Sequence, residues 1–129
     1  MNSDMADEGL KFWTSSPNVF LVATNESDEA IGSIAYQEMT SNTVELNRLA
    51  VDSRMRGLRI GQKLINALQD TARDNGYENM YLDTSIAQSP AIKLYEKMNF
   101  KFLRCCKNEY FLLDVITGLH CVAYMKTLK

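Results

Sequence analysis

The sequence predicts a single α/β domain with one mixed, mostly antiparallel sheet and helices packed on it. Two observations predict this class. Short segments rich in β-branched and aromatic residues succeed one another up to residue 51, which is typical of strands. From residue 60 the apolar residues recur at helical spacing, and strand character returns over 78–84. The resulting strand–helix–strand unit, from 43 to 84, implies one parallel pair in the sheet.

Ahead of the central helix, one helix and three strands are expected. Residues 4–13 carry a weak helical signal that ends before a Ser-Ser-Pro sequence. The segments 18–24 and 30–38 are rich in β-formers and are separated by a polar turn, so they predict an antiparallel hairpin. After a further polar turn, the segment 43–51 is the third predicted strand.

The central helix is expected over 60–74 and ends at Asn75 and Gly76, because glycine readily adopts the left-handed backbone that closes a helix. A strand over 78–84 follows. Ser89 is an N-cap ahead of Pro90, and together they predict a second helix that continues to about residue 98. Two last strands are expected at about 101–113 and 119–127, joined by a turn at Thr117 and Gly118.

Length and composition exclude several classes of protein. The 129 residues have room for one domain, so residues 1–129 are predicted to form a single domain. The formal net charge is −2, whereas nucleic-acid binders are usually basic, so no nucleic-acid partner is expected. No apolar run reaches the roughly 18–20 residues that span a bilayer, and the acidic N-terminus does not resemble a secretory signal. No membrane-spanning segment is therefore expected in this chain.

The cysteine count bears on compartment and on metal binding. Three cysteines are an odd number and suit a reducing compartment, so a cytoplasmic location is expected. With the single histidine, His120, they lack the spacing of metal ligands, so no metal is expected. The three are Cys105, Cys106 and Cys121.

A basic turn lies where the third strand leads into the central helix. A helix N-terminus presents unpaired N–H groups and the positive end of the helix dipole, and arginine binds phosphate with two hydrogen bonds. The turn therefore predicts a phosphate or pyrophosphate site; the alternative is a solvated basic helix end. Neither a Walker loop nor a dinucleotide fingerprint is present. The basic residues are Arg54, Arg56, Arg59 and Lys63, with Gly57 and Gly61 among them.

Two motifs resemble those of the GNAT superfamily of N-acetyltransferases. The strand Val44 to Val51 (VELNRLAV), followed by Arg56 to Gly61 (RGLRIG), looks like its acetyl-coenzyme A motif. The segment from Ala91 to Phe100 (AIKLYEKMNF) looks like its second conserved helix. The resemblance runs from about residue 18 to the C-terminus. The chain looks most like the camello-type branch, which includes acetylators of aspartate and of cysteine S-conjugates.

The resemblance implies acetyl-coenzyme A as co-substrate. In the family, the pantetheine arm pairs with the strand ahead of the basic turn, and the pyrophosphate lies on the amides of the turn. Arg56 and Arg59 would flank the pyrophosphate, and Gln88 aligns with an asparagine that binds the arm. The residues implied to bind the coenzyme are Leu49, Ala50, Val51, Arg56, Gly57, Leu58, Arg59, Ile60, Gly61, Gln62, Gln88 and Ser89.

The resemblance also implies two catalytic residues. Glu45 aligns with a strand glutamate that acts as general base, and without a bulge it shares one face with Asn47, Leu49 and Val51. The alternatives for Glu45 are an exposed carboxylate or an anchor for the substrate ammonium. Tyr95 occupies the position of the general-acid tyrosine that protonates the leaving thiolate; the alternative is a core tyrosine. The expected reaction is direct acetyl transfer to a primary amine, of a small molecule or a protein, in a ternary complex.

The chain departs from the family pattern in three places. Arg59 replaces the first motif glycine, and Asn99 replaces the glycine before Phe100. The first strand of the family fold is expected to be missing, which would leave the edge of 18–24 uncovered. An uncovered edge invites pairing, so a homodimer or a partner segment is expected there. Two other readings remain: a non-catalytic acyl-coenzyme A binding module and a nucleotide-binding regulator.

Overall fold

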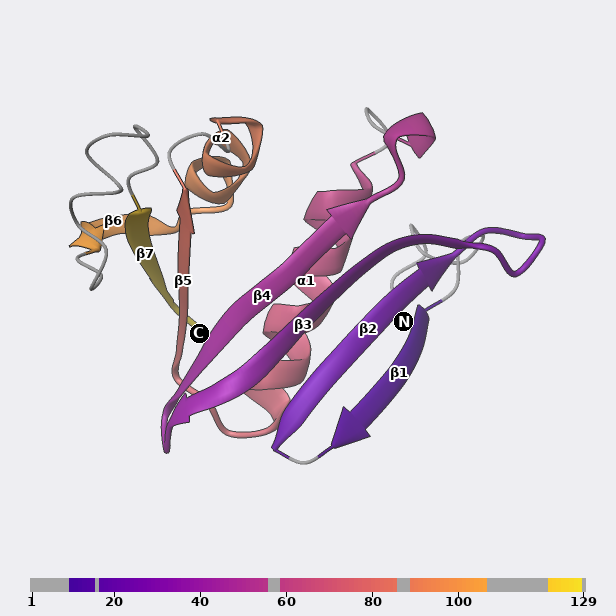
Figure 1. Cartoon of the computed structure of the whole chain (residues 1–129). Helices are drawn as coiled ribbons and strands as arrows, with labels where there is room; N and C mark the ends of the chain where they lie inside the picture. The colour runs from indigo at the N-terminus through magenta and orange to yellow at the C-terminus, as the bar shows by residue number, and fades with distance from the viewer. Residues whose placement is uncertain (1–9, 16, 56–58, 86–88, 107–120, 129) are drawn as a thin grey trace.

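The computed structural model describes residues 10–15, 17–55, 59–85, 89–106 and 121–128. Seven strands form one sheet in the order β1-β2-β3-β4-β5-β7-β6, with α1 packed across one face and α2 beside β5 (Figure 1). The strands are β1 Leu10–Ser15, β2 Asn18–Thr24, β3 Ala30–Thr40, β4 Thr43–Val51, β5 Asn79–Ser85, β6 Lys101–Cys106 and β7 Cys121–Thr127; the helices are α1 Ile60–Asp74 and α2 Ser89–Lys97.

The sheet is mixed, as the sequence predicts. β4 and β5 pair in parallel through the crossover helix α1, and every other described neighbour pair is antiparallel. The predicted fold class is therefore confirmed. In the described part of the chain, no helix is both long enough and apolar enough to cross a membrane.

The N-terminal segment corrects one expectation. Leu10–Ser15 is a strand rather than a helix, and it pairs with β2 from Leu10↔Ala23 to Ser15↔Asn18. The helical pattern of the segment is weak, and two effects favour a strand: the segment pairs with β2, and it contains the β-forming residue types Phe, Trp and Thr. The edge of β2 is therefore covered, and the expectations of a missing first strand and of an uncovered edge at 18–24 were wrong. Residues 4–9 lie outside the described residues.

The core lies between the sheet and α1. Every fourth or third residue of α1 points at the strands, as an amphipathic helix requires. The buried residues of this layer include Leu21, Ile34, Val44, Leu46, Met80 and Leu82 from the sheet, and Ile60, Leu64, Ile65, Leu68 and Ala72 from α1.

Both helices end in the same way. Gly76 follows α1 with a φ of 91°, and the N–H of Tyr77 donates to the carbonyl of Ala72 at 3.0 Å. Asn99 follows α2 with a φ of 71°, and the N–H of Phe100 donates to the carbonyl of Tyr95 at 3.0 Å. Asparagine tolerates this left-handed conformation, so Asn99 closes α2 in place of the motif glycine.

The last two strands are shorter in the described structure than in the prediction. β6 ends at Cys106 and β7 begins at Cys121. The rest of the predicted strand over 101–113, and the predicted turn at Thr117 and Gly118, lie outside the described residues.

Candidate active site

The parallel pair separates soon after it forms. Only three residue pairs join β4 to β5, and the last is Glu45↔Tyr81. Beyond it β5 continues with β7 as far as Ser85, while β4 continues with β3 as far as Val51. The two strands therefore diverge (Figure 1), and from Leu46 onward β4 pairs with no described strand on its β5 side.

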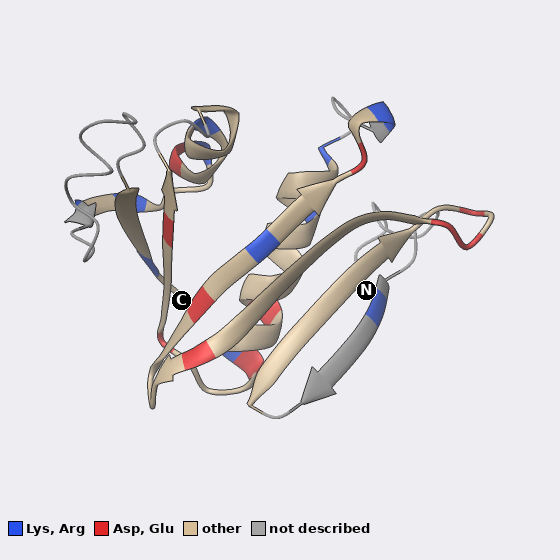
Figure 2. Ribbon diagram, in the orientation of Figure 1, with Lys and Arg blue, Asp and Glu red and all other residues tan. Residues whose placement is uncertain are grey.

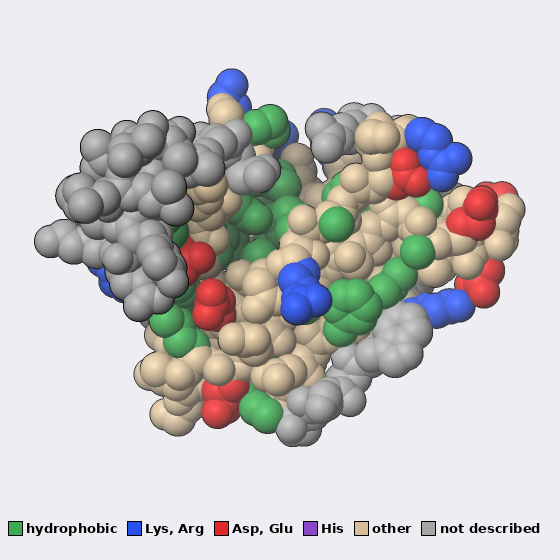
Figure 3. All heavy atoms as spheres, viewed as in Figure 1, with side chains coloured by type: hydrophobic (Ala, Val, Ile, Leu, Met, Phe, Trp, Pro, Cys, Tyr) green, Lys and Arg blue, Asp and Glu red, His purple; other side chains and the backbone are tan. Residues whose placement is uncertain are grey.

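A cleft of about 410 Å³ lies in this divergence. Charged residues lie on both strands that border it (Figure 2), and Figure 3 shows the hollow with apolar side chains inside it. The residues that line the cleft are Glu45, Leu46, Asn47, Arg48 and Leu49 from β4, Leu82, Asp83, Thr84 and Ser85 from β5, and Ala91 and Tyr95 on α2.

A β-bulge in β4 decides which side chains face which way. Asn47 and Ala50 of β4 pair with Ala35 and Ser33 of β3, so two residues of β4 lie between these pairs where β3 has only one. Arg48, within the bulge, has a φ of 59°. After the bulge, Leu49 and Val51 pack against the core, on the same side as Leu46. Glu45 and Asn47 therefore do not share a face with Leu49 and Val51, because the shared face was expected only for a strand without a bulge. The bulge reverses the alternation by inserting one residue.

Glu45 is half-buried on the β4 wall of the cleft. Burial raises the pKa of its carboxyl above the usual range, and the negative charge of Asp83 raises it further. Within the described part of the chain, no side chain donates a hydrogen bond to Glu45 or forms an ion pair with it. A carboxyl in this state is suited to accept a proton near neutral pH.

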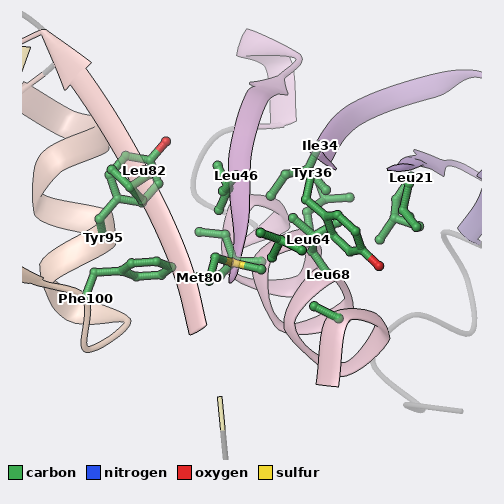
Figure 4. Packing of buried hydrophobic residues seen from close by; sticks show 14 of the residues in the cluster. Leu21, Ile34, Tyr36, Leu46, Leu64, Leu68, Met80, Leu82, Tyr95 and Phe100 are labelled. Carbon is green, nitrogen blue, oxygen red and sulfur yellow. The ribbon is translucent and has the colours of Figure 1, made fainter. Parts of the chain in front are cut away.

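Tyr95 reaches the same cleft from α2. Its side chain is 6% exposed, and its ring packs edge-on against Phe100 with centroids 5.9 Å apart. Figure 4 shows the ring beside Leu82 with its hydroxyl directed away from Phe100. Among the described residues the hydroxyl makes no hydrogen bond. Burial raises the pKa of Tyr95, so the phenol keeps its proton at neutral pH.

Asp83 and Arg48 were not among the sequence-predicted site residues. Asp83 is exposed on the β5 wall, and the Tyr81 hydroxyl donates to its Oδ2 at 3.3 Å. The guanidinium of Arg104 lies 5.9 Å from the centre of the Tyr81 ring. A signal was available for Asp83: it follows buried Leu82 on a strand that pairs in parallel with the strand of Glu45.

The N-terminus of α1 is open to an anion. Arg59 is the N-cap, with φ 60° and ψ 28°, and no side chain caps the helix there. The first N–H groups of a helix lack intrahelical partners, so Ile60, Gly61 and Gln62 present their amides at this end. The left-handed φ of Arg59 explains why the motif has glycine at its position. Arg54, from the same basic turn, is paired with Asp52 at 2.7 Å.

Of the remaining residues that the resemblance implies to bind the coenzyme, some lie in the described structure and some lie outside it. Leu49 lines the cleft, Ala50 and Val51 continue β4 beyond it, and Ser89 begins α2. The side chain of Ile60 is buried in the core, so only its backbone is available to a ligand. Arg56, Gly57, Leu58 and Gln88 lie outside the described residues. Within the described chain, no group of three potential metal ligands is present.

Residues 2–100 match the Acetyltransferase (GNAT) family. The chain belongs to the GNAT family. A Danio rerio N-acetylaspartate synthetase is 33% identical over 102 residues, which are 78% of this chain and 36% of that protein. A Xenopus tropicalis relative that carries the name camello is 33% identical over 103 residues, 78% of this chain and 47% of its own. The predicted resemblance to the camello-type branch is thereby confirmed.

A solved GNAT structure shares the fold along the whole domain. The GNAT family acetyltransferase from Elizabethkingia anophelis, solved with acetyl-CoA bound, has a TM-score of 0.79 and 16% identity. The match covers 95% of this chain and 99% of that one. The curated relatives are longer: this GNAT chain spans about a third to a half of their length.

Proposed function

We propose that this chain is an acetyl-CoA-dependent N-acetyltransferase that acts on a primary amine. One observation carries the proposal: a carboxyl with a raised pKa and a buried, protonated phenol face one cleft, where two parallel strands diverge. Pure coenzyme binding would need neither Glu45 nor Tyr95. GNAT family membership and the acetyl-CoA held by the Elizabethkingia relative support the choice of coenzyme.

Two features of the chain suit acetyl-CoA. The β5-facing edge of β4, from Leu46 to Val51, offers backbone groups to the amides of a pantetheine arm. The uncapped N-terminus of α1 offers N–H groups to a pyrophosphate, with the Arg59 side chain exposed beside it. When bound, acetyl-CoA supplies an activated acetyl thioester. A backbone N–H of β4 would polarise its carbonyl and stabilise the oxyanion.

Glu45 and Tyr95 then have complementary roles. Glu45 removes a proton from the amine, directly or through water, so that the nitrogen lone pair can attack. Tyr95 donates its proton to the departing thiolate and recovers one from the nitrogen through water. The acetyl group passes directly from coenzyme to amine in a ternary complex, with no covalent enzyme intermediate.

The test is thiol release from acetyl-CoA over a panel of primary amines and amine-bearing peptides. We expect Tyr95→Phe and Glu45→Gln each to lower kcat by about 10²- to 10⁴-fold, the range of general acid–base catalysis. Tyr77→Phe is the matched control, because that phenol donates to Glu38 and does not line the cleft. Its rate should equal that of the wild type.

Two outcomes would reject the proposal in different ways. Full activity in both cleft variants would remove the assigned roles while leaving an acetyltransferase. Tight acetyl-CoA binding without turnover on any amine would favour the non-catalytic acyl-CoA module.

A further inference from the structure

Two carboxylates face each other across the cleft. Glu45 lies on β4 opposite Tyr81 of β5, and Asp83 is two residues further along β5, so it projects from the same face as Tyr81. Both carboxylates line the cleft, and they are close enough that the negative charge of Asp83 raises the pKa of Glu45. Figure 2 shows acidic residues on both strands at the divergence.

Neither carboxylate is neutralised by a cation in the described structure. Glu45 is half-buried without an ion pair, and Asp83 accepts a hydrogen bond from Tyr81 alone. Like charges that share a site repel one another, and a partly buried carboxylate without a partner is unfavourable. The arrangement is therefore complementary to a positive charge that arrives from outside.

A third group points to a ligand in the same place. The Tyr95 hydroxyl belongs to a side chain that is 6% exposed, has no hydrogen-bond partner among the described residues, and opens on the cleft. The hydroxyl oxygen itself is not enclosed by protein, so it reaches the open space of the cleft and is available to a ligand there. It lines the same cleft as the two carboxylates, from a third element, α2.

The other charged and titratable groups near Asp83 come from several elements. Tyr81 donates a hydrogen bond to Oδ2 of Asp83, and the Arg104 guanidinium lies 5.9 Å from the centre of the Tyr81 ring; Oδ1 accepts no hydrogen bond from a described residue. Arg48, on the β4 wall, is exposed and forms no ion pair with a described residue. The described groups that face the pair are therefore Arg48 on β4, Tyr81 on β5, Arg104 on β6 and Tyr95 on α2.

We infer that the acceptor enters the cleft as an ammonium ion held between Glu45 and Asp83, with Asp83 as the residue that selects a charged amine. The inference rests on the proposed function and names the form in which its acceptor binds. Glu45 takes one proton from the ammonium, the nitrogen attacks the thioester carbon, and the C–S bond breaks as the C–N bond forms. The thiolate receives one proton and a second leaves to water, so the net products are amide, thiol and H⁺.

The inference can be tested without turnover. We would follow the side-chain carboxyl carbons by NMR at pH 7 while adding butylammonium chloride, with 1-butanol as the neutral control. Butylammonium should move the Glu45 and Asp83 signals and butanol should not. Asp83→Asn should weaken butylammonium binding by about tenfold, as expected for loss of a charge-assisted hydrogen bond. Asp83→Glu should retain it, and Asp74→Asn, an exposed aspartate at the end of α1, should match the wild type.

A second readout separates substrate binding from folding. In Asp83→Asn, the pH midpoint of Glu45 should fall, because the neighbouring negative charge is gone. With any amine that the enzyme turns over, KM should rise more than kcat falls. Unchanged butylammonium binding together with an unchanged KM would overturn the inference. Butylammonium binding that is lost in Asp83→Asn, with no turnover on any amine, would keep the cation site and reject the proposed function.

Discussion

Glu45 is the residue at which stability and the proposed activity oppose each other. Its ionised form is disfavoured in the folded protein by burial and by Asp83. A group whose pKa is raised on folding contributes stability below its unfolded pKa and loses that contribution as pH rises through the folded pKa. The carboxylate at position 45 therefore lowers the free energy of unfolding at neutral pH.

Glu45→Gln should accordingly raise the free energy of unfolding at pH 7 by up to about 1 kcal/mol, since the site is partly exposed and screened by solvent. The gain should vanish below about pH 4, where glutamate is protonated in both states. Thermal unfolding from pH 3 to pH 8 measures it. Glu78→Gln is the control, because Glu78 is exposed and lies immediately before β5. A variant less stable than the wild type at pH 7 would contradict the prediction.

Backbone conformation at single residues also marks the site. The described residues other than glycine with positive φ are Asp28, Arg48, Arg59 and Asn99. Three of these four lie at the bulge, at the N-terminus of α1 and at the end of α2. Such conformations persist where the surrounding structure requires them. Here they accompany the bulge in the β4 edge, the open amides at the start of α1 and the end of the helix that carries Tyr95.

At the scale of elements, close approach positions α1. A Cβ added at Gly32 of β3 would lie 2.9 Å from Leu64 Cδ1 and 3.2 Å from the carbonyl oxygen of Ala50. At Gly61 it would lie 3.1 Å from Leu94 Cδ2 of α2. Both glycines therefore allow α1 to approach its neighbours, but only the contact at Gly32 involves backbone.

Gly32→Ala should lower the free energy of unfolding by about 1–3 kcal/mol, because neither the helix nor the Ala50 carbonyl can move freely. Gly61→Ala should be close to neutral, since the end of the Leu94 side chain can shift and alanine favours the helix by about 1 kcal/mol over glycine. Urea unfolding of the two variants measures the difference. Equal losses would contradict the assignment of the Gly32 contact as the tighter one.

At the scale of the whole molecule, the sheet has two parts that share few strand contacts. One part is β1 to β4 and the other is β5 to β7. Three residue pairs between β4 and β5 join them, and both parts contribute residues to the core that packs against α1. A ligand that pairs with β4 beyond Glu45 would fill the space where the two parts of the sheet separate. Because such a ligand binds only the folded protein, it should raise the free energy of unfolding of the whole domain.

Acetyl-CoA at 100 times its dissociation constant should raise the free energy of unfolding by about 2.7 kcal/mol. Hydrogen exchange should slow at the amides of β4 between Leu46 and Val51, and at the first turn of α1. Differential scanning calorimetry and amide exchange measure the two effects. Exchange that slows only outside these segments would show that the coenzyme binds elsewhere.

Much of the fold could be predicted from local patterns. The bounds of β2, β4 and α1 agree with the predicted segments, because alternation, helical spacing and the Asn75–Gly76 stop are local. Glu45 and Tyr95 could be named from motif positions. β1 could not, because its strand state depends on pairing with β2.

The sequence by itself determined the order of strands and helices from residue 18 onward, the parallel unit and the two candidate catalytic residues, since each depends on neighbours along the chain. Only the tertiary structure decided which side chains share the cleft. The bulge at Arg48 turns Leu49 and Val51 toward the core, and the divergence of β4 from β5 places Glu45 and Asp83 on the two strands that border the cleft. Both depend on strand register between segments far apart in the chain, which local periodicity does not specify.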